Sequence, residues 1–189
     1  HRALAELSGL AVSADMPSLL VAATSTSATV VGVESAAVAR SVDDAGTLRF
    51  DAVTRELRPD VVIAAGTGSL SGYALAHHEA TVCVDTREES RFDVSAMNLM
   101  GYRSGAAVPI TTGAGQWGAL IVFGTEPSVV GEGELTFLSA VAGVLSGALE
   151  RVDLDRRLHR RSMHDPLTGL PNRRQFARDV VFHHPQPMP

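Results

Sequence analysis

The sequence predicts an α+β fold in which helices flank an antiparallel sheet and a long helix follows it. Residues 29–40 and 47–57 are rich in β-branched side chains that broadly alternate with other residues, as in half-buried strands. The Asp-Asp-Ala-Gly segment at 43–46 lies between them and is typical of a hairpin turn, which joins antiparallel neighbours. Residues 134–163 carry apolar side chains at spacings of three and four, which indicates one long helix.

Two helices are expected to precede the sheet. Apolar residues recur at helical spacing from Arg2 to Val12. A second helix is predicted from Met16 to Ala23, because Asp15 is a suitable N-cap and Pro17 fits the first turn, where its missing N–H costs nothing. The domain should therefore begin with a helical pair.

A glycine-rich segment in the middle of the chain permits two interpretations. Gly66 to Gly72 read Gly-Thr-Gly-Ser-Leu-Ser-Gly after an apolar run, and a short helix and a strand that ends in Asp85 follow. This order is that of a dinucleotide-binding unit, in which Asp85 would bind a ribose hydroxyl, so an oxidoreductase-like domain is one alternative. The glycine spacing departs from that motif, however, and the chain continues with a second hairpin, residues 102–111 and 115–125.

The composition is that of an ordinary soluble domain. Of the 189 residues, 45% are hydrophobic and 20% are charged, and the net charge is −5. Uninterrupted apolar runs are shorter than the ~18 residues of a membrane span, so we expect a cytoplasmic protein without a membrane segment. The acidic excess before residue 150 argues against a nucleic-acid partner. Cys83 is the single cysteine, and the sequence predicts no metal-ligand cluster.

Five segments follow one another along the second half of the domain: Gly-Ser-Leu-Ser-Gly-Tyr-Ala at 68–74, the strand at 81–85, Ser-Arg-Phe at 90–92, and the strands at 102–110 and 116–123 with Val-Pro-Ile and Gly-Ala-Leu. Taken in this order, they resemble a GAF domain. The resemblance implies a sensor domain over residues 2–149, with helices around an antiparallel sheet. It also implies that an unknown small-molecule effector binds between this sheet and the helices that cross one of its faces.

The resemblance further implies which side chains would surround that effector. The candidate pocket residues are mostly apolar and come from the glycine-rich segment and the strands that follow it: Leu70, Tyr73, Phe92, Met97, Met100, Tyr102, Val108 and Ile110. Taken singly, each is better explained as a core residue. A haem bound by His77 or His78 is a minor alternative, since a histidine pair at a helix end is typical of a solvated cap.

The long C-terminal helix is predicted to carry a dimer contact. Its heptad-spaced apolar positions include Leu138, Leu145, Leu149 and Val152. The same stripe would also fit against the helix's own domain, but a parallel homodimer is expected because the helix outlasts that domain. Residues 150–164 would then form a signalling linker. A dimerisation module without a ligand is a further alternative function.

The segment at 165–174 reads Asp-Pro-Leu-Thr-Gly-Leu-Pro-Asn-Arg-Arg and resembles the entry motif of GGDEF diguanylate cyclases. The resemblance implies an interdomain turn in which Asp165 pairs with Arg173 or Arg174, and Asn172 begins the next helix. Residues 165–189 would be the truncated start of a cyclase domain. The chain has no two adjacent glycines for a GTP-binding turn, so we expect no enzyme activity in it. GTP and Mg²⁺ would belong to the missing part, and the parent would be a bacterial enzyme that makes cyclic di-GMP.

Overall fold

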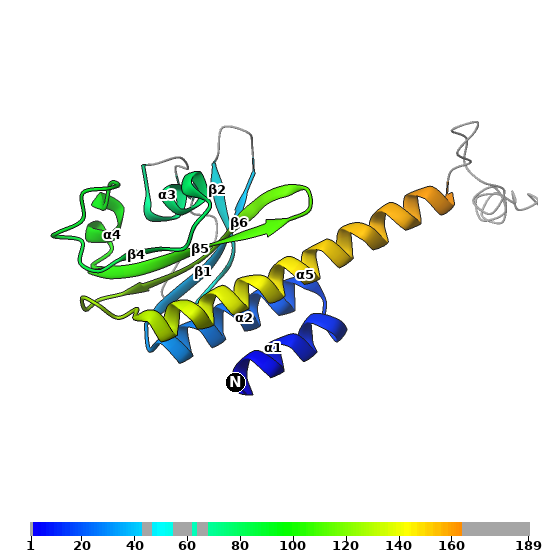
Figure 1. Cartoon of the computed structure of the whole chain (residues 1–189), viewed down its shortest axis with the longest axis horizontal. Coiled ribbons are helices and arrows are strands. Elements are labelled where there is room, and N and C mark those ends of the chain that lie inside the picture. The colour runs from blue at the N-terminus through cyan, green and yellow to red at the C-terminus, as the bar shows by residue number, and fades with distance from the viewer. Residues whose placement is uncertain (1, 43–46, 55–61, 64–67, 164–189) are drawn as a thin grey trace, which may run out of the picture. The chain divides into compact units, whose positions relative to one another are not determined.

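The computed structural model describes residues 2–42, 47–54, 62–63 and 68–163. The chain divides into two units, residues 1–149 and 150–189, and the first contains the sheet (Figure 1). The predicted turns at 43–46 and 165–174 lie outside the described residues, as do Gly66 and Thr67 of the glycine-rich segment. The architecture below is therefore that of the first unit, with the helix that leads out of it.

The sheet has six strands in the order β3-β2-β1-β6-β5-β4, and every described pairing is antiparallel. The strands are β1 Ser35–Ser41, β2 Leu48–Val53, β3 Val62–Ile63, β4 Thr81–Cys83, β5 Ser104–Thr112 and β6 Gly115–Gly124. The predicted antiparallel α+β fold is confirmed. The dinucleotide-binding alternative is wrong, because β3 and β4 lie at opposite edges of the sheet and form no parallel β-α-β unit.

The helices are α1 Arg2–Ser13, α2 Met16–Val31, α3 Leu70–His77, α4 Ser95–Leu99 and α5 Glu132–Met163. Asp15 caps α2 as predicted, because its carboxylate accepts a hydrogen bond from the Ser18 N–H at 2.8 Å. The helix continues to Val31, however, over residues that the sequence assigns to a strand. The helix ends at Gly32, whose φ of 75° lies in the left-handed region. Glycine adopts this conformation readily, whereas β-branched residues do not, so Gly32 is the C-cap.

The central strands β1, β5 and β6 contain runs of buried residues, so both of their faces are covered, whereas β2 alternates buried and exposed residues. Val38, Val108 and Leu120 belong to a core shared with α1, α2 and α5. Their strand neighbours face α3 and α4 instead, on the other side of the sheet (Figure 1). Small residues let the central strands pack tightly: a Cβ on Gly118 would overlap the Ala39 carbonyl.

Helix α5 uses its heptad-spaced residues to cover its own sheet. Leu138 and Leu145 are 1% and 0% exposed in the core with α1 and α2, and Leu149 packs against the same cluster. Val152 is half-buried in the unit that follows. The predicted dimer seam is therefore wrong at Leu138 and Leu145. An amphipathic core helix and a coiled-coil seam repeat their apolar residues at nearly the same spacing, so the pattern alone did not separate them.

Residues Glu132–Leu158 of α5 are long and apolar enough to cross a membrane by length and composition. Uninterrupted apolar runs did not indicate this, because Thr136, Ser139 and Ser146 separate its leucines and valines. Leu138 and Leu145 on the same helix lie in the core beneath the sheet.

Leu145→Ala should lower the free energy of unfolding by about 2–5 kcal/mol, because it leaves a cavity at a fully buried site. Leu99→Ala is the matched control, since Leu99 is 90% exposed and its loss should change stability by less than about 0.5 kcal/mol. Urea unfolding followed by circular dichroism measures both. A Leu145→Ala variant as stable as the wild type would mean that α5 does not belong to this core.

Candidate ligand-binding face

The face of the sheet beneath α3 and α4 has a floor of small residues. Ala37, Ala39, Ala107 and Ala119 lie there on the central strands, with Ile121 between them in the same cluster. Glycine at position 105 allows β5 and β6 to pair closely, because a Cβ there would stand 2.5 Å from the Val122 carbonyl oxygen. Helix α3 is fixed at its start by Ser69, whose side chain accepts a hydrogen bond from the Gly72 N–H at 3.0 Å.

The structure brings together part of the predicted pocket. Leu70, Phe92, Met97 and Tyr102 are buried in one cluster on this face, and Tyr73 packs against its edge. These residues are packed as core residues, which is the simpler of the two interpretations given for each of them.

The remaining predicted pocket residues lie elsewhere. Val108 and Ile110 face the opposite side of the sheet, toward α1, α2 and α5, because they alternate with Ala107 along β5. Met100 caps the C-terminal end of α4 and is 45% exposed. A pocket formed by all of the predicted residues is therefore wrong, since one pleated strand presents successive side chains to two different layers.

Tyr102 anchors the buried part of this face. Its hydroxyl and the Ser35 Oγ atom lie 2.6 Å apart in a buried hydrogen bond, and its ring stacks on Phe123 with centroids 5.0 Å apart. A buried tyrosine with a satisfied hydroxyl is stable in an apolar setting. Tyr102 thus joins the chain after α4 to the start of β1 and holds the covering segment on the sheet.

An aromatic and charged cluster lies at the edge of the same face. The Tyr73 ring stacks on His77 at 3.9 Å and contacts Phe92 at 5.4 Å between centroids. The Arg91 guanidinium lies over both Tyr73 and Phe92, 5.6 and 5.4 Å from their ring centroids. This geometry suits a cation–π interaction. The cluster, which we call the Arg91 cluster, comprises Tyr73, His77, Glu89, Arg91 and Phe92.

Glu89 holds Arg91 in this position. Its carboxylate accepts hydrogen bonds from Arg91 Nε and Nη2 at 2.9 and 2.7 Å, while Arg91 Nη2 also donates to the Val82 carbonyl at 2.6 Å. The hydrogen bonds from Arg91 keep the pKa of Glu89 below its usual value, so the pair stays charged at neutral pH. Glu89 and Arg91 were absent from the predicted site. The Ser-Arg-Phe segment at 90–92, one of the GAF-like segments, was the signal that pointed to them.

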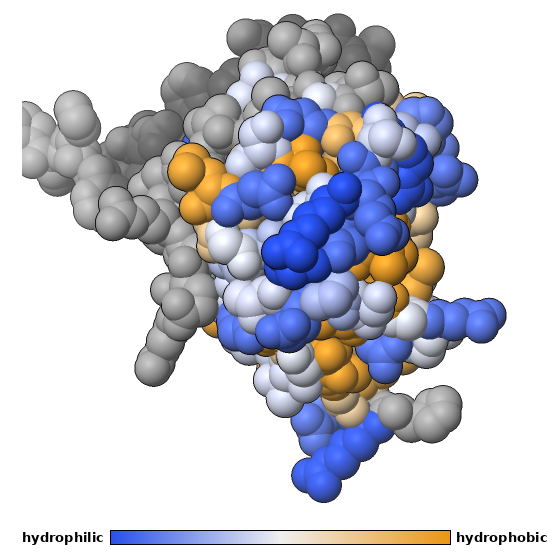
Figure 2. Space-filling model, turned by 90° about the vertical axis from the view of Figure 1, so that its left-hand side faces the viewer, coloured by the Kyte–Doolittle hydropathy of each residue, from blue (hydrophilic) through white to orange (hydrophobic). Residues whose placement is uncertain are grey.

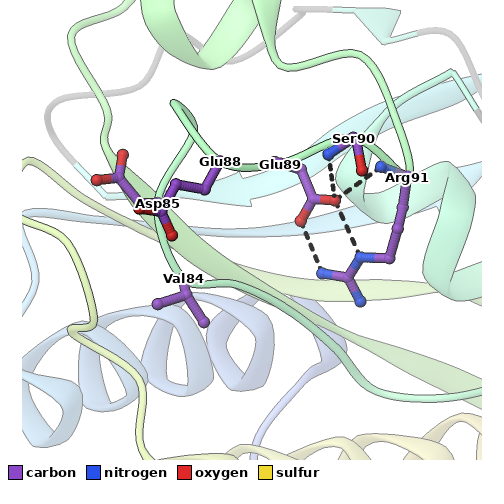
Figure 3. A pocket seen from close by; sticks show the side chains of 6 residues that line it. All are labelled: Val84, Asp85, Glu88, Glu89, Ser90 and Arg91. Carbon is purple, nitrogen blue, oxygen red and sulfur yellow. Dashed lines mark hydrogen bonds and ion pairs between the residues drawn. The ribbon is translucent and has the colours of Figure 1, made fainter.

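A shallow hollow of about 290 Å³ opens beside this cluster and is lined by Val84, Asp85, Glu88, Glu89, Ser90 and Arg91 (Figure 3). Figure 2 shows the end of the domain that carries α4, with apolar patches separated by hydrophilic side chains. Asp85 accepts hydrogen bonds from Arg103 Nε and Nη2 at 3.1 and 2.5 Å, which lower its pKa. It is thus an ion-pair partner and not the ribose ligand of a dinucleotide site. Nowhere in the described residues do three potential ligands converge on a metal position.

The two histidines lie on the outside of α3. His78 is the C-cap in the left-handed conformation with φ 57°, and its Nδ1 atom lies 2.8 Å from Gln116 Nε2. The Nδ1 atom of His77 lies 2.9 Å from the Tyr73 carbonyl oxygen. Both side chains are exposed, so neither offers an axial ligand to a haem in the interior of this face. Asp165, Asn172, Arg173 and Arg174 of the predicted interdomain turn lie outside the described residues.

Cys83 is buried in β4, and burial, followed by the nearby Glu89 carboxylate, raises the pKa of its thiol to about 11. The thiol is therefore protonated at neutral pH and covered by the fold, and it should be a poor nucleophile. Iodoacetamide at pH 8 should label Cys83 in urea but leave the folded protein almost unmodified, as measured by intact mass. Rapid labelling of the folded protein would show that this face opens.

Comparisons with known proteins agree with this geometry. A family model described as GAF domain matches residues 13–150. A search of curated proteins finds no match. Among solved structures, free methionine-R-sulfoxide reductase from Neisseria meningitidis is 18% identical, with a TM-score of 0.68, and the match covers 79% of this chain and 89% of that chain.

Two further structures resemble the fold to the same degree. The GAF domain of an Acinetobacter phosphoenolpyruvate-protein phosphotransferase and the phycoerythrobilin-bound GAF domain of a cyanobacterial phytochrome each have a TM-score of 0.68 and 17% identity. Each match covers 82% of this chain and 96% of the other. The family match over residues 13–150, the antiparallel sheet and the layers on its two faces together show that this chain belongs to the GAF domain family.

Proposed function

We propose that this chain is the cytoplasmic sensory part of a diguanylate cyclase. In this proposal a small-molecule effector binds at the α3 and α4 face, and a homodimer passes the signal to cyclase domains that make cyclic di-GMP. The observation that carries the proposal is one of sequence order. A GAF domain is followed by helix α5 and then, at 165–174, by a segment that resembles the start of a GGDEF domain.

The chemistry of the Arg91 cluster supports an effector with an unsaturated or planar group and a polar end. The half-buried Tyr73 ring offers aromatic surface, and Arg91 and Glu89 offer a donor and an acceptor beside it. The similar structures have methionine sulfoxide chemistry and bound bilins in their descriptions. A buried single cysteine fits neither a cysteine-based reductase nor a thioether-linked bilin, so we infer a noncovalent ligand.

A signal from this face has a short path to α5. The strands β5 and β6 contact α3 with alternate residues, such as Ala107 and Ile121, and the α1, α2 and α5 layer with the residues between them. A ligand that moves α3 or α4 would therefore shift β5 and β6, and with them the residues that pack against α5. The ligand regulates the cyclase only if its affinity differs between two arrangements of that layer.

A dimerisation module without a ligand is the second candidate. One observation favours it: Leu70, Phe92, Met97 and Tyr102 are packed as a core and leave no need for a ligand to stabilise them.

The purified 189-residue chain should convert no GTP to cyclic di-GMP, because it lacks adjacent glycines for the turn that approaches GTP. Chromatography of nucleotides after incubation with GTP and Mg²⁺ measures this. The same assay on the parent protein should show product. Turnover by this chain alone, or an inactive parent under all conditions, would contradict the cyclase assignment.

Arg91→Met should remove the effector, since it deletes the donor but keeps much of the apolar stem. Because it also removes the partner of Glu89, whose side chain is 5% exposed, the melting temperature of the variant is measured alongside to show that it is folded. Arg87→Met is the control, because Arg87 is an exposed arginine of the same loop whose side chain lies outside the Arg91 cluster. Native mass spectrometry of both variants, purified from the source organism, should find a bound mass in the wild type and in Arg87→Met only. If no preparation carries a bound mass, the ligand-free module is the better account.

A further inference from the structure

Residues 93–101 cross the α3 and α4 face as a strap that is only weakly attached to it. Helix α4 lies within this strap, on the same side of the sheet as α3 (Figure 1). Met97 is the one buried residue of the strap, at 5% exposed, and Val94 is half-buried against the same cluster. The other residues are exposed, among them Leu99 at 90% and Met100 at 45%. The strap therefore rests on the domain mainly through a single side chain.

The hydrogen bonds of the strap are internal. The N–H groups of Asn98, Met100 and Gly101 donate to carbonyls of the strap itself at 2.9, 3.2 and 3.0 Å. Ser95 donates to the Oδ1 atom of Asp93 with both its N–H, at 2.8 Å, and its hydroxyl, at 2.5 Å. The described part of the chain shows no hydrogen bond from residues 93–101 to the sheet or to α3. Lifting the strap would therefore break no hydrogen bond to the sheet.

The residues on either side of the strap are fixed. Before it, Phe92 is buried at 7% exposed. After it, Tyr102 is buried at 6% exposed and its hydroxyl lies 2.6 Å from Ser35 Oγ. Between strap and anchor, Gly101 takes the left-handed conformation with φ 80°, although a Cβ there would meet no atom within 4 Å. Glycine is thus favoured at this position for its backbone freedom, and such a residue absorbs the angle changes of a hinge.

The space that Met97 fills adjoins the Arg91 cluster. Met97 and Phe92 belong to one buried cluster, and the Arg91 guanidinium lies 5.4 Å from the centroid of the Phe92 ring. The same buried cluster includes the small residues that form the floor of this face. Methionine is unbranched and flexible, so it fills such a space without a fixed shape. Withdrawal of Met97 would open an apolar space beside the charged groups of the proposed site.

We propose that residues 93–101 open as a unit between Phe92 and Tyr102, and that Met97 is the plug that closes the α3 and α4 face. Opening carries Met97 into water and exposes the apolar space that it fills. The effector enters by this route and places its apolar part where Met97 lies in the closed protein. The effector's part in this mechanism rests on the proposed function, whereas the opening itself does not. An opening strap would let a face that is packed as a core admit a ligand.

The first experiment measures how often Met97 reaches water. Hydrogen peroxide converts methionine to its sulfoxide, and peptide mass spectrometry gives separate rates for Met97 and for Met100, the exposed control on the same strap. Opening of the strap exposes little surface, so the Met97 rate should change by less than about twofold in urea concentrations that leave the domain folded. A rate limited by global unfolding would instead rise about tenfold or more for each added molar of urea. That steep rise, or no oxidation of Met97 in the folded protein, would overturn the proposal.

The second experiment makes the plug charged. In Met97→Asp the carboxylate leaves with the strap, so the loss of stability is limited to the cost of opening, and we expect a folded domain with a cooperative thermal transition by circular dichroism. Ile121→Asp is the matched control and should abolish folding, because Ile121 is 0% exposed in the same cluster but lies on β6, where a charge stays buried.

An unfolded Met97→Asp variant would show that Met97 is an ordinary core residue and would refute the strap. Both experiments use the 189-residue chain without effector. Their failure therefore removes this entrance but leaves the sensor assignment standing, and a failure to find a bound effector leaves the opening of the strap intact.

Discussion

The domain depends on the close pairing of β1, β6 and β5, three strands whose side chains are buried on both faces of the sheet. Small residues such as alanine and glycine in these strands leave room for helices to pack against both faces of the sheet. At Gly118 the neighbouring strand leaves no room for a Cβ, since the Ala39 carbonyl occupies that space. Helices α2 and α3 pack on the residues that these strands present to them, and α1 packs on α2.

Burial on both faces also gives the two sides of the sheet different surroundings. The α3 and α4 face ends in the Arg91 cluster, where aromatic rings and an ion pair reach the surface together. The opposite face packs against α2 and α5, with α1 on α2, and its core is apolar apart from Thr24 and Ser27 of α2.

The ion pair between Glu89 and Arg91 fixes the position of the guanidinium. The Arg91 side chain is 45% exposed but that of Glu89 only 5%, so loss of Arg91 would leave a buried carboxylate without its partner. The pair also has a geometric role, because Glu89 and the Val82 carbonyl direct the guanidinium over two rings. Asp85 and Arg103 similarly join the loop after β4 to the residue that precedes β5, which fixes the edge of the hollow.

Local patterns in the sequence were sufficient for the antiparallel class, the second hairpin, the Asp15 cap and the existence of a long helix, because turn chemistry and spacing act over a few residues. The end of α2 was missed, since Thr29 to Val31 favour a strand locally and the helix is stopped only by Gly32. Val108 and Ile110 face one layer and Ala107 faces the other. Which residues of β5 face which layer depends on how the strand lies in the sheet, and the sequence does not show this. The partners of Leu138 and Leu145 were likewise decided by tertiary structure. An apolar stripe on a helix predicts that this side of the helix will be buried, but only the tertiary structure determines which element covers it.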